Sequence, residues 1–345
     1  MKKQEEKYQW IVEPLVSWYE ENARILPWRD DANPYRVWVS EIMLQQTRVD
    51  AVIAYFNRFM ETLPTVWDLA KADESVVLKL WEGLGYYSRA RNLKKTAEIV
   101  CEQYGGNFPQ GYKELLALPG IGKYTVGSIS SIAFGLPRAA VDGNVLRVIT
   151  RLDENPRDIM DEKFRKEIAQ QLEPVYPQGK CSEFTQSLME LGAMICVPNG
   201  APKCEECPLK NGCRANQNGT WEKYPVKKEK PKRKKVNKTV FLLKCEGKTA
   251  IQKGEDKGLL AGLWKLPNVE KKLTEKEIKE WLEEQHLEAI SIEKTKKVKH
   301  IFTHVEWHMQ GYEIICRKAN EQFYWATEKE LQEDFALPTA YKKIQ

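Results

Sequence analysis

Leu118-Pro-Gly-Ile-Gly-Lys-Tyr-Thr125 is the stretch that decides the fold of the first half of this chain. A proline and two glycines stand between two apolar segments, 112–118 and 124–134, that have helical periodicity. A Gly-x-Gly turn that opens a helix leaves backbone N–H groups free to hold a phosphate. The stretch therefore predicts two helices joined by a phosphate-binding turn, although an ordinary pair of antiparallel helices fits the same pattern.

A second motif follows, Ala139-Ala-Val-Asp-Gly-Asn-Val-Leu-Arg147, in which Asp142 stands 22 residues after Gly120. Taken alone, this aspartate fits a helix N-cap or an Asx-turn. A hairpin followed at this spacing by such an aspartate resembles the helix-hairpin-helix-Gly/Pro-Asp superfamily of base-excision DNA glycosylases. The resemblance implies that Gly120 and Gly122 hold the DNA backbone.

The length and the pattern of the chain favour two domains. Its 345 residues, of which 42% are apolar and 30% charged, suit a soluble globular protein, and a net charge of +5 permits an anionic partner without requiring one. Helical periodicity runs to about residue 215. Lys227–Lys238 is a basic run typical of a solvated linker, with a DNA-backbone role as the alternative. We expect a mainly α domain over 1–220, a basic linker over 221–238 and an α+β domain over 239–345.

Strand-like alternation in the second part is expected at Thr239–Leu243, Thr249–Gln252, Ser291–Val298, His300–His308 and Tyr312–Cys316. Glu275–Glu284 is the one clear helix among them.

Four cysteines form a compact cluster, Cys196-x7-Cys204-x2-Cys207-x5-Cys213. In a presumed cytosolic chain this indicates a metal site, with structural zinc as the generic alternative. Because only Cys204 and Cys207 are closely spaced, a cubane iron–sulfur cluster fits better than two zinc knuckles. The pattern resembles the cluster loop of endonuclease III and MutY enzymes, which implies a [4Fe-4S] cluster in loop 196–213. That family has six residues in the first gap, whereas this chain has seven.

Three further segments resemble the MutY-type adenine glycosylase branch: Leu26–Arg29 (LPWR), Val39–Val49 (VSEIMLQQTRV) and Trp81–Arg89 (WEGLGYYSR). Bifunctional members of the superfamily carry a nucleophilic lysine where this chain has Tyr124. Lys123 is adjacent, but one residue along a helix turns the side chain by about 100 degrees. The resemblance therefore implies base removal without efficient lyase chemistry.

The resemblance also implies a division of labour between two carboxylates. Glu41 is the expected general acid toward adenine N7, which requires a pKa raised by an apolar pocket that Trp28, Met43, Leu44 and Val49 could form. Asp142 is the expected ionised carboxylate that stabilises the oxocarbenium ion, supported by Tyr124 and Asn144. Arg24, Arg29 and Glu190 are expected to line the adenine pocket.

For DNA recognition, the resemblance assigns Tyr86 as an intercalating wedge and Gln46, Thr47 and Leu84 as contacts to 8-oxoguanine. In the second part, Gly258–Pro267 (GLLAGLWKLP) resembles a Nudix-like domain. Lys265 and Lys271 occupy positions where an active Nudix site needs metal-binding residues, so no nucleotide hydrolysis is expected. Phe302-Thr-His304 resembles a Phe-Ser-His loop, which implies that Thr303 contacts the oxidised base.

Together these features predict an adenine DNA glycosylase of base-excision repair that hydrolyses the glycosidic bond of adenine mispaired with 8-oxoguanine or guanine. The expected partner is double-stranded DNA, and no association with a membrane is expected. We expect a monomer that works in a bacterial-type cytoplasm, at the nucleoid. Neither a signal peptide nor a transmembrane segment is recognisable. The alternatives are an endonuclease III-like glycosylase/lyase for oxidised pyrimidines, a non-catalytic DNA-lesion reader and an active Nudix hydrolase.

Overall fold

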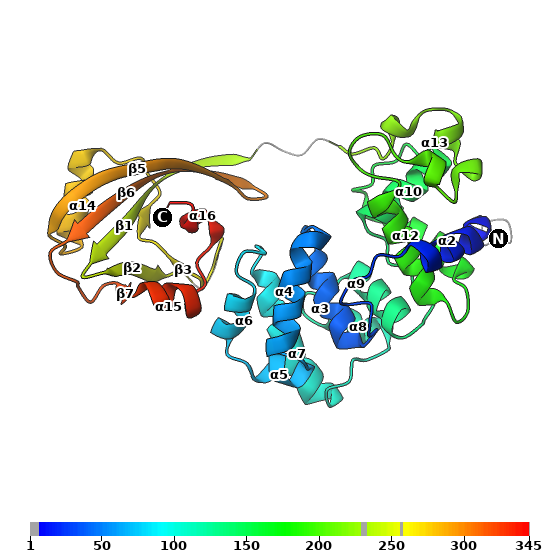
Figure 1. Ribbon diagram of the computed structural model, residues 1–345, viewed down its shortest axis with the longest axis horizontal. Helices are drawn as coiled ribbons and strands as arrows, with labels where there is room; N and C mark the ends of the chain where they lie inside the picture. Colours follow the sequence, from blue (N-terminus) through cyan, green and yellow to red (C-terminus); the bar gives the residue numbers. More distant parts are fainter. Residues whose placement is uncertain (1–6, 229–232, 256–257, 345) are drawn as a thin grey trace. The chain divides into compact units, whose positions relative to one another are not determined.

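A computed structural model describes residues 7–228, 233–255 and 258–344 of the chain (Figure 1). The chain divides into two compact units. The first unit comprises Met1–Lys71 and Asn92–Glu229, and the second comprises Ala72–Arg91 and Lys230–Gln345. The segment Ala72–Arg91 lies within the predicted domain over 1–220 and groups by its contacts with the second unit.

The first unit is helical. Its helices are α2 (Gln9–Asn22), α3 (Pro34–Leu44), α4 (Val49–Thr62), α5 (Val66–Lys71), most of α7 (Ser88–Tyr104), α8 (Tyr112–Ala117), α9 (Lys123–Ser128), α10 (Gly143–Asp153), α11 (Glu162–Leu172), α12 (Cys181–Met194) and α13 (Arg214–Gln217). A π-helical turn, Ile129–Ala133, continues α9.

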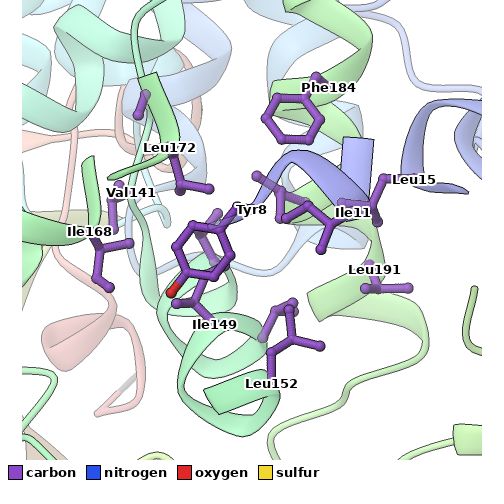
Figure 2. Close-up of a cluster of buried hydrophobic side chains, with 14 of the residues drawn as sticks. Tyr8, Ile11, Leu15, Val141, Ile149, Leu152, Ile168, Leu172, Phe184 and Leu191 are labelled. Carbon is purple, nitrogen blue, oxygen red and sulfur yellow. The ribbon is translucent and has the colours of Figure 1, made fainter. Parts of the chain in front are cut away.

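Apolar residues at helical spacing build the core of this unit. In α2, Ile11 and Leu15 are fully buried, as the predicted helical periodicity from Tyr8 onward requires. Figure 2 shows them facing Phe184 and Leu191 of α12 and Ile149 of α10. This packing of α2, α10 and α12 places the first turn of α10 next to the site described below.

The predicted turn between two helices joins α8 to α9. Gly120 has a φ of +75°, and a Cβ at this position would come within 2.8 Å of Asn92 Cβ. Both facts favour glycine. Thr96 Oγ1 donates to the Pro119 carbonyl at 2.8 Å and holds the turn against α7. Lys123 begins α9 directly after Gly122.

The second unit contains a mixed sheet in the order β3-β2-β1-β6-β5, with β4 paired to β1 and β7 paired to β2 (Figure 1). The elements are α6 (Glu74–Leu80), β1 (Lys234–Cys245), β2 (Lys248–Lys253), β3 (Trp264–Lys265), β4 (Asn268–Val269), α14 (Glu275–Glu284), β5 (Ala289–Ile301), β6 (Val305–Cys316), β7 (Tyr324–Ala326), α15 (Glu328–Glu333) and α16 (Thr339–Lys342). Strand β6 is parallel to β1 and antiparallel to β5.

Two hydrophobic clusters cover opposite faces of this sheet. Trp307 and Met309 of β6 pack with Tyr341 of α16. On the other face, Phe241 of β1 and Ile314 of β6 belong to a cluster with α14. The helix Glu275–Glu284 is confirmed with its predicted bounds, and a capping box at Thr274 and Glu277 begins it.

Two expectations about the second unit need correction. The predicted strand His300–His308 is not one strand: it comprises the end of β5, which stops at Ile301, a turn over 302–304, and the start of β6 at Val305. Apolar and polar residues alternate in both strands that flank this turn, so the alternation in the sequence does not mark where one strand ends and the next begins. Strand β1 begins at Lys234, within the predicted linker 221–238. The Val226 carbonyl accepts from Ile159 N–H in the first unit, and residues 229–232 lie outside the described residues.

The segment Ala72–Arg91 joins the second unit through polar contacts. Glu82 accepts from the Leu337 backbone N–H at 2.7 Å and pairs with Lys342 at 3.0 Å. Lys79 donates to the carbonyl of Phe335 at 3.0 Å. The side chain of Arg91 donates to the Ala261 carbonyl.

None of the helices in the described part of the chain combines the length and the apolar content needed to cross a membrane.

Candidate active site

A cavity of about 540 Å³ in the first unit gathers the predicted catalytic residues. It lies between α3, the start of α9, the start of α10 and α12. The predicted residues that line it are Arg24, Trp28, Arg29, Glu41, Leu44, Gln46, Thr47, Val49, Tyr124, Asp142, Asn144 and Glu190. Segments separated by up to about 160 positions in the sequence thus form one site, with Leu26, Val37, Ile132, Val141 and Met189 adding apolar walls.

Glu41 on α3 is the buried acid of this cavity, with 6% of its surface exposed. Burial raises the pKa of its carboxyl to about 7, against the opposing effect of hydrogen bonds from Tyr124 and Ser128. The Tyr124 hydroxyl donates to Glu41 Oε2, and Ser128 Oγ donates to the same atom at 3.1 Å. A large fraction of Glu41 therefore remains protonated at neutral pH, as a general acid requires.

Two details of this environment differ from the sequence-based expectation. Tyr124 is predicted to support Asp142, but its hydroxyl donates to Glu41, because α9 packs against α3. Met43 is predicted to line the acid's pocket, but it points into the core and is fully buried. Met43 follows Glu41 by only two residues, which places it on the opposite side of α3.

Asp142 is the N-cap of α10 and also faces the cavity. Its Oδ1 accepts from Val145 N–H at 2.7 Å, and its Oδ2 accepts from the Asn144 amide at 2.8 Å. Burial raises the pKa of Asp142, while these two hydrogen bonds and Arg147 act in the opposite direction. Asn144 thus hydrogen-bonds the carboxylate that it is predicted to support.

Arg147 holds this turn of α10 in place. Its Nη2 donates to Asn144 Oδ1 at 2.8 Å and to the Gly192 carbonyl at 2.6 Å. Its Nε donates to the Cys196 carbonyl at 2.6 Å. One guanidinium thus links Asp142, through Asn144, to α12 and to the cysteine loop.

Glu190 lies on the α12 wall of the cavity as a paired carboxylate. Its Oε1 accepts from Arg24 Nε at 2.6 Å, and its Oε2 accepts from Arg29 Nη2 at 2.8 Å. Burial would raise its pKa, yet these two guanidinium groups lower the pKa to about 2. At neutral pH Glu190 is therefore ionised, whereas Glu41 in the same cavity is partly protonated.

The hairpin borders a second cavity of about 950 Å³, which Gly120, Gly122 and Lys123 line. The two cavities share Gln45, Tyr124, Val141 and Arg165. Lys123 lies only on the hairpin side, whereas Tyr124 faces both cavities. The hairpin and the acid site are thus neighbours, with Tyr124 between them.

Three of the predicted DNA contacts lie in the second unit. Leu84 is buried, whereas Tyr86 is 46% exposed and has a φ of +48°. The Tyr86 hydroxyl lies 2.7 Å from Thr303 Oγ1, in the turn between β5 and β6. The predicted wedge and the predicted base-reading residue are therefore hydrogen-bonded to each other.

The four clustered cysteines line one small cavity of about 30 Å³. Among the described residues, no set of three or more His, Cys, Asp or Glu side chains is placed to hold a single metal ion. The donors around this cavity are four thiols, with Ile195 and Ala215 as apolar neighbours, and Arg151 Nη1 donates to Cys196 Sγ at 3.3 Å. Soft sulfur ligands in such surroundings fit an iron–sulfur cluster.

The longer first gap of the cysteine motif is accommodated locally. The Lys203 N–H donates to the Ile195 carbonyl at 3.0 Å and closes the loop at its base. Residues 198–201 are exposed, so the additional residue lies on the surface.

Three further residues of the site, Ser128, Arg147 and Gln186, have no role assigned by the sequence motifs. Ser128 follows Tyr124 by four residues, so helical spacing could have placed both on one face of α9. Arg147 contacts α12 and the cysteine loop, 45 and 49 residues away in the sequence. Gln186 accepts from Arg29 Nε at 2.9 Å, also a long-range contact. Neither of these two contacts has a local sequence signal.

Comparison with known proteins agrees with this geometry. Residues 39–174 match the HhH-GPD superfamily of base excision DNA repair proteins, and residues 239–345 match a NUDIX domain. An adenine DNA glycosylase from Buchnera aphidicola (from Schizaphis graminum) is 36% identical over 86% of this chain and 84% of its own length. The chain belongs to the adenine DNA glycosylase family.

Members of this family extend to mammals. The adenine DNA glycosylase of Mus musculus is 34% identical over 96% of this chain and 76% of its own length. Among solved structures, a thermostable thymine-DNA glycosylase has a TM-score of 0.56 and 32% identity, and the match covers 63% of this chain and 98% of that one. The helical glycosylase fold and the Nudix-like second domain predicted from the sequence are thereby confirmed, and DNA is the substrate class of the family.

Proposed function

We propose that this glycosylase removes adenine mispaired with 8-oxoguanine or guanine from double-stranded DNA, by hydrolysis of the glycosidic bond. The observation that carries the proposal is the buried Glu41 carboxyl, whose pKa is raised to about 7, in the same cavity as Asp142. Adenine is a poor leaving group until a ring nitrogen accepts a proton, so an acid of this kind is what its release requires.

The step balances with these two residues and one water. Adenine enters the cavity flipped out of the duplex, and Glu41 gives its proton to N7. The C1′–N9 bond breaks, and its electron pair leaves with the base. Asp142 stabilises the oxocarbenium ion on the sugar. Water then adds to C1′, where its oxygen becomes a hydroxyl group, and the proton that it releases goes to Glu41.

The reaction stops at base removal. A lyase step needs an amine within reach of C1′. Tyr124 occupies the position of the nucleophilic lysine in bifunctional members of the superfamily. Burial and the nearby Glu41 raise the pKa of Tyr124 well above the usual range, so it remains neutral. Lys123 lines the hairpin cavity and not the cavity that holds Asp142.

We also propose contacts to the opposite base, within each unit considered by itself. Gln46 and Thr47 line the acid cavity, and Thr303 contacts Tyr86 in the second unit. We propose that the Thr303 hydroxyl, in the turn between β5 and β6, hydrogen-bonds 8-oxoguanine and that Tyr86 occupies the stacking gap.

Cys196, Cys204, Cys207 and Cys213 would hold a [4Fe-4S] cluster. Once bound, it would tie the exposed loop after α12 to α13 and so fix the carbonyl of Cys196 that Arg147 contacts. Iron, sulfide and zinc analysis of anaerobically purified protein tests this. Iron with equal sulfide supports the cluster, whereas stoichiometric zinc without sulfide contradicts it. Cys207→Ser is expected to lower the iron content, and Cys101→Ser, which changes a buried thiol elsewhere, is expected to retain it.

The test of the main proposal uses excess enzyme and a duplex with one adenine opposite 8-oxoguanine. Half of each sample is analysed directly on a denaturing gel, and half is first heated in alkali. Strand cleavage only after alkali is expected. Cleavage without alkali would mean lyase chemistry, which Lys123→Ala would then assign or exclude. No cleavage from iron-loaded protein would contradict the proposal and favour an oxidised pyrimidine substrate or a non-catalytic lesion reader.

A further inference from the structure

Within the described residues of the second unit, no helix of that unit covers one half of one face of its β-sheet. Strand partners in the register share a face, so Lys235, Glu306 and Ile301 lie on one side, as do Asn237, His308 and Lys299. Farther along the same face, Phe241 and Ile314 pack against α14. Figure 1 shows α14 at the end of the sheet away from the β5–β6 turn. The uncovered end is therefore the end that carries Thr303.

This uncovered end is basic. Lys235 of β1 and Lys297 and Lys299 of β5 are exposed on it. We call Lys235, Asn237, Lys297, Lys299, Glu306 and His308 the basic half-face. Its carboxylate, Glu306, is 8% exposed, pairs with Lys299 at 3.0 Å and hydrogen-bonds His308 at 2.6 Å. The opposite side of the same strands carries Val236, Val298 and Trp307, which pack into the core.

We propose that the basic half-face binds the phosphate backbone of the duplex beside the mispaired purine. The proposal rests on the function proposed above. A sheet face that lacks a covering helix but is charged rather than apolar suits a polyanion and not an apolar partner. The basic half-face lies next to the turn that carries Thr303, so the two can have different roles. Phosphate contacts orient the β5–β6 hairpin on the DNA, and its turn contacts the base.

Lysines on edge strands also discourage pairing between chains, and β5 is an edge strand. That role needs no DNA. The two roles differ in how DNA binding responds to salt, because each phosphate contact contributes about 0.9 to the slope of log K against log salt concentration.

The test measures binding to duplexes that hold 2′-fluoro-2′-deoxyadenosine opposite either 8-oxoguanine or guanine, over a range of salt concentrations. The variant is Lys235→Gln with Lys297→Gln. The control is Lys279→Gln with Lys318→Gln, which removes the same charge from exposed positions at the α14 end of this unit. Thermal unfolding checks that both variants fold.

In the Lys235→Gln/Lys297→Gln variant, the slope of log K against log salt concentration is expected to fall in magnitude by roughly 2. The affinity for both duplexes is expected to fall by the same factor. The control is expected to keep the wild-type slope. An unchanged slope in the first variant would overturn the proposal and indicate that these lysines only discourage strand pairing between chains. An equal decrease of the slope in both variants would overturn it as well, because net charge and not this surface would then explain the effect. Failure of the wild type to bind either mispaired duplex would instead contradict the proposed function.

Discussion

At the scale of single residues, Glu41 and Glu190 show how one cavity holds two carboxyl groups in different states. Both are buried, but Glu41 is paired with hydroxyl groups, whereas Glu190 is paired with two guanidinium groups. Burial dominates at Glu41, and charge pairing dominates at Glu190. The acid and the structural carboxylate are therefore distinguished by their partners and not by their depth.

Glu41→Gln is expected to abolish adenine removal and to stabilise the fold at neutral pH. The folded pKa of Glu41, about 7, exceeds the unfolded value of 4.5. The contribution of Glu41 to the free energy of unfolding is therefore fully present below about pH 4.5. It is lost as the pH rises through about 7, and the loss amounts to up to about 3 kcal/mol. Gln carries no charge and avoids this loss. Thermal unfolding of both proteins between pH 4 and pH 8 measures the difference, and a wild-type curve parallel to that of the variant would contradict it.

Ser128→Ala is expected to shift the alkaline limb of the pH profile for base removal upward, by up to about one pH unit. The change deletes a hydrogen bond that favours the ionised form of Glu41, so the acid would hold its proton to higher pH. Ser131→Ala is the matched control, because Ser131 Oγ donates to the Gly127 carbonyl instead. Single-turnover rates across pH test the shift, and identical limbs in both variants would refute it.

At the scale of secondary-structure elements, the site depends on the close approach of α12 to the start of α10. A Cβ at Gly192 would come within 2.6 Å of Asn144 Cβ and 3.0 Å of Asn144 Cα. The Gly192 carbonyl also accepts from Arg147. The absence of a side chain at Gly192 thus sets the position of Asn144, and through it the position of Asp142.

Gly192→Ala is therefore expected to reduce the rate of adenine removal at least tenfold while the protein still folds. The added methyl group must displace the first turn of α10, and small misplacement of a catalytic group is costly. Circular dichroism and thermal unfolding report the fold, and single-turnover kinetics report the rate. A wild-type rate would show that α12 can move without carrying Asn144 with it.

At the scale of the whole molecule, the second unit is assembled from two distant parts of the sequence. Ala72–Arg91 contributes Lys79, Glu82, Tyr86 and Arg91 to contacts with residues beyond 260. The family signature at Trp81–Arg89 thus belongs by its contacts to the unit that carries the Nudix-like sheet. The proposed wedge and the proposed base-reading loop are held in one unit.

Glu82→Ala is expected to destabilise the C-terminal end of this unit by about 1–3 kcal/mol, because it leaves the Leu337 N–H and Lys342 without their partner. Hydrogen exchange at residues 328–344 is the measurement. Glu321→Ala, at an exposed position of the same unit, is the control. Equal exchange in the two variants would mean that Glu82 does not hold this end of the unit.

The sequence by itself determined the elements and most of the chemistry. The hairpin, the aspartate that follows it, Glu41 within an apolar segment and the four cysteines are local patterns. The structure brings the two carboxylates to one acid cavity, the hairpin to the neighbouring cavity and the cysteines to one thiol-lined cavity. Local patterns suffice here because glycine turns, caps and helical spacing depend on neighbouring residues.

Only the tertiary structure decided how these parts contact one another. It placed Tyr124 and Ser128 on Glu41, linked Asp142 to the cysteine loop through Arg147, moved Ala72–Arg91 into the second unit and left one half of a sheet face basic and uncovered. Each of these features joins residues that are far apart in the sequence, or depends on which helix covers a face. Such contacts arise from packing, and a single sequence carries no local signal for them.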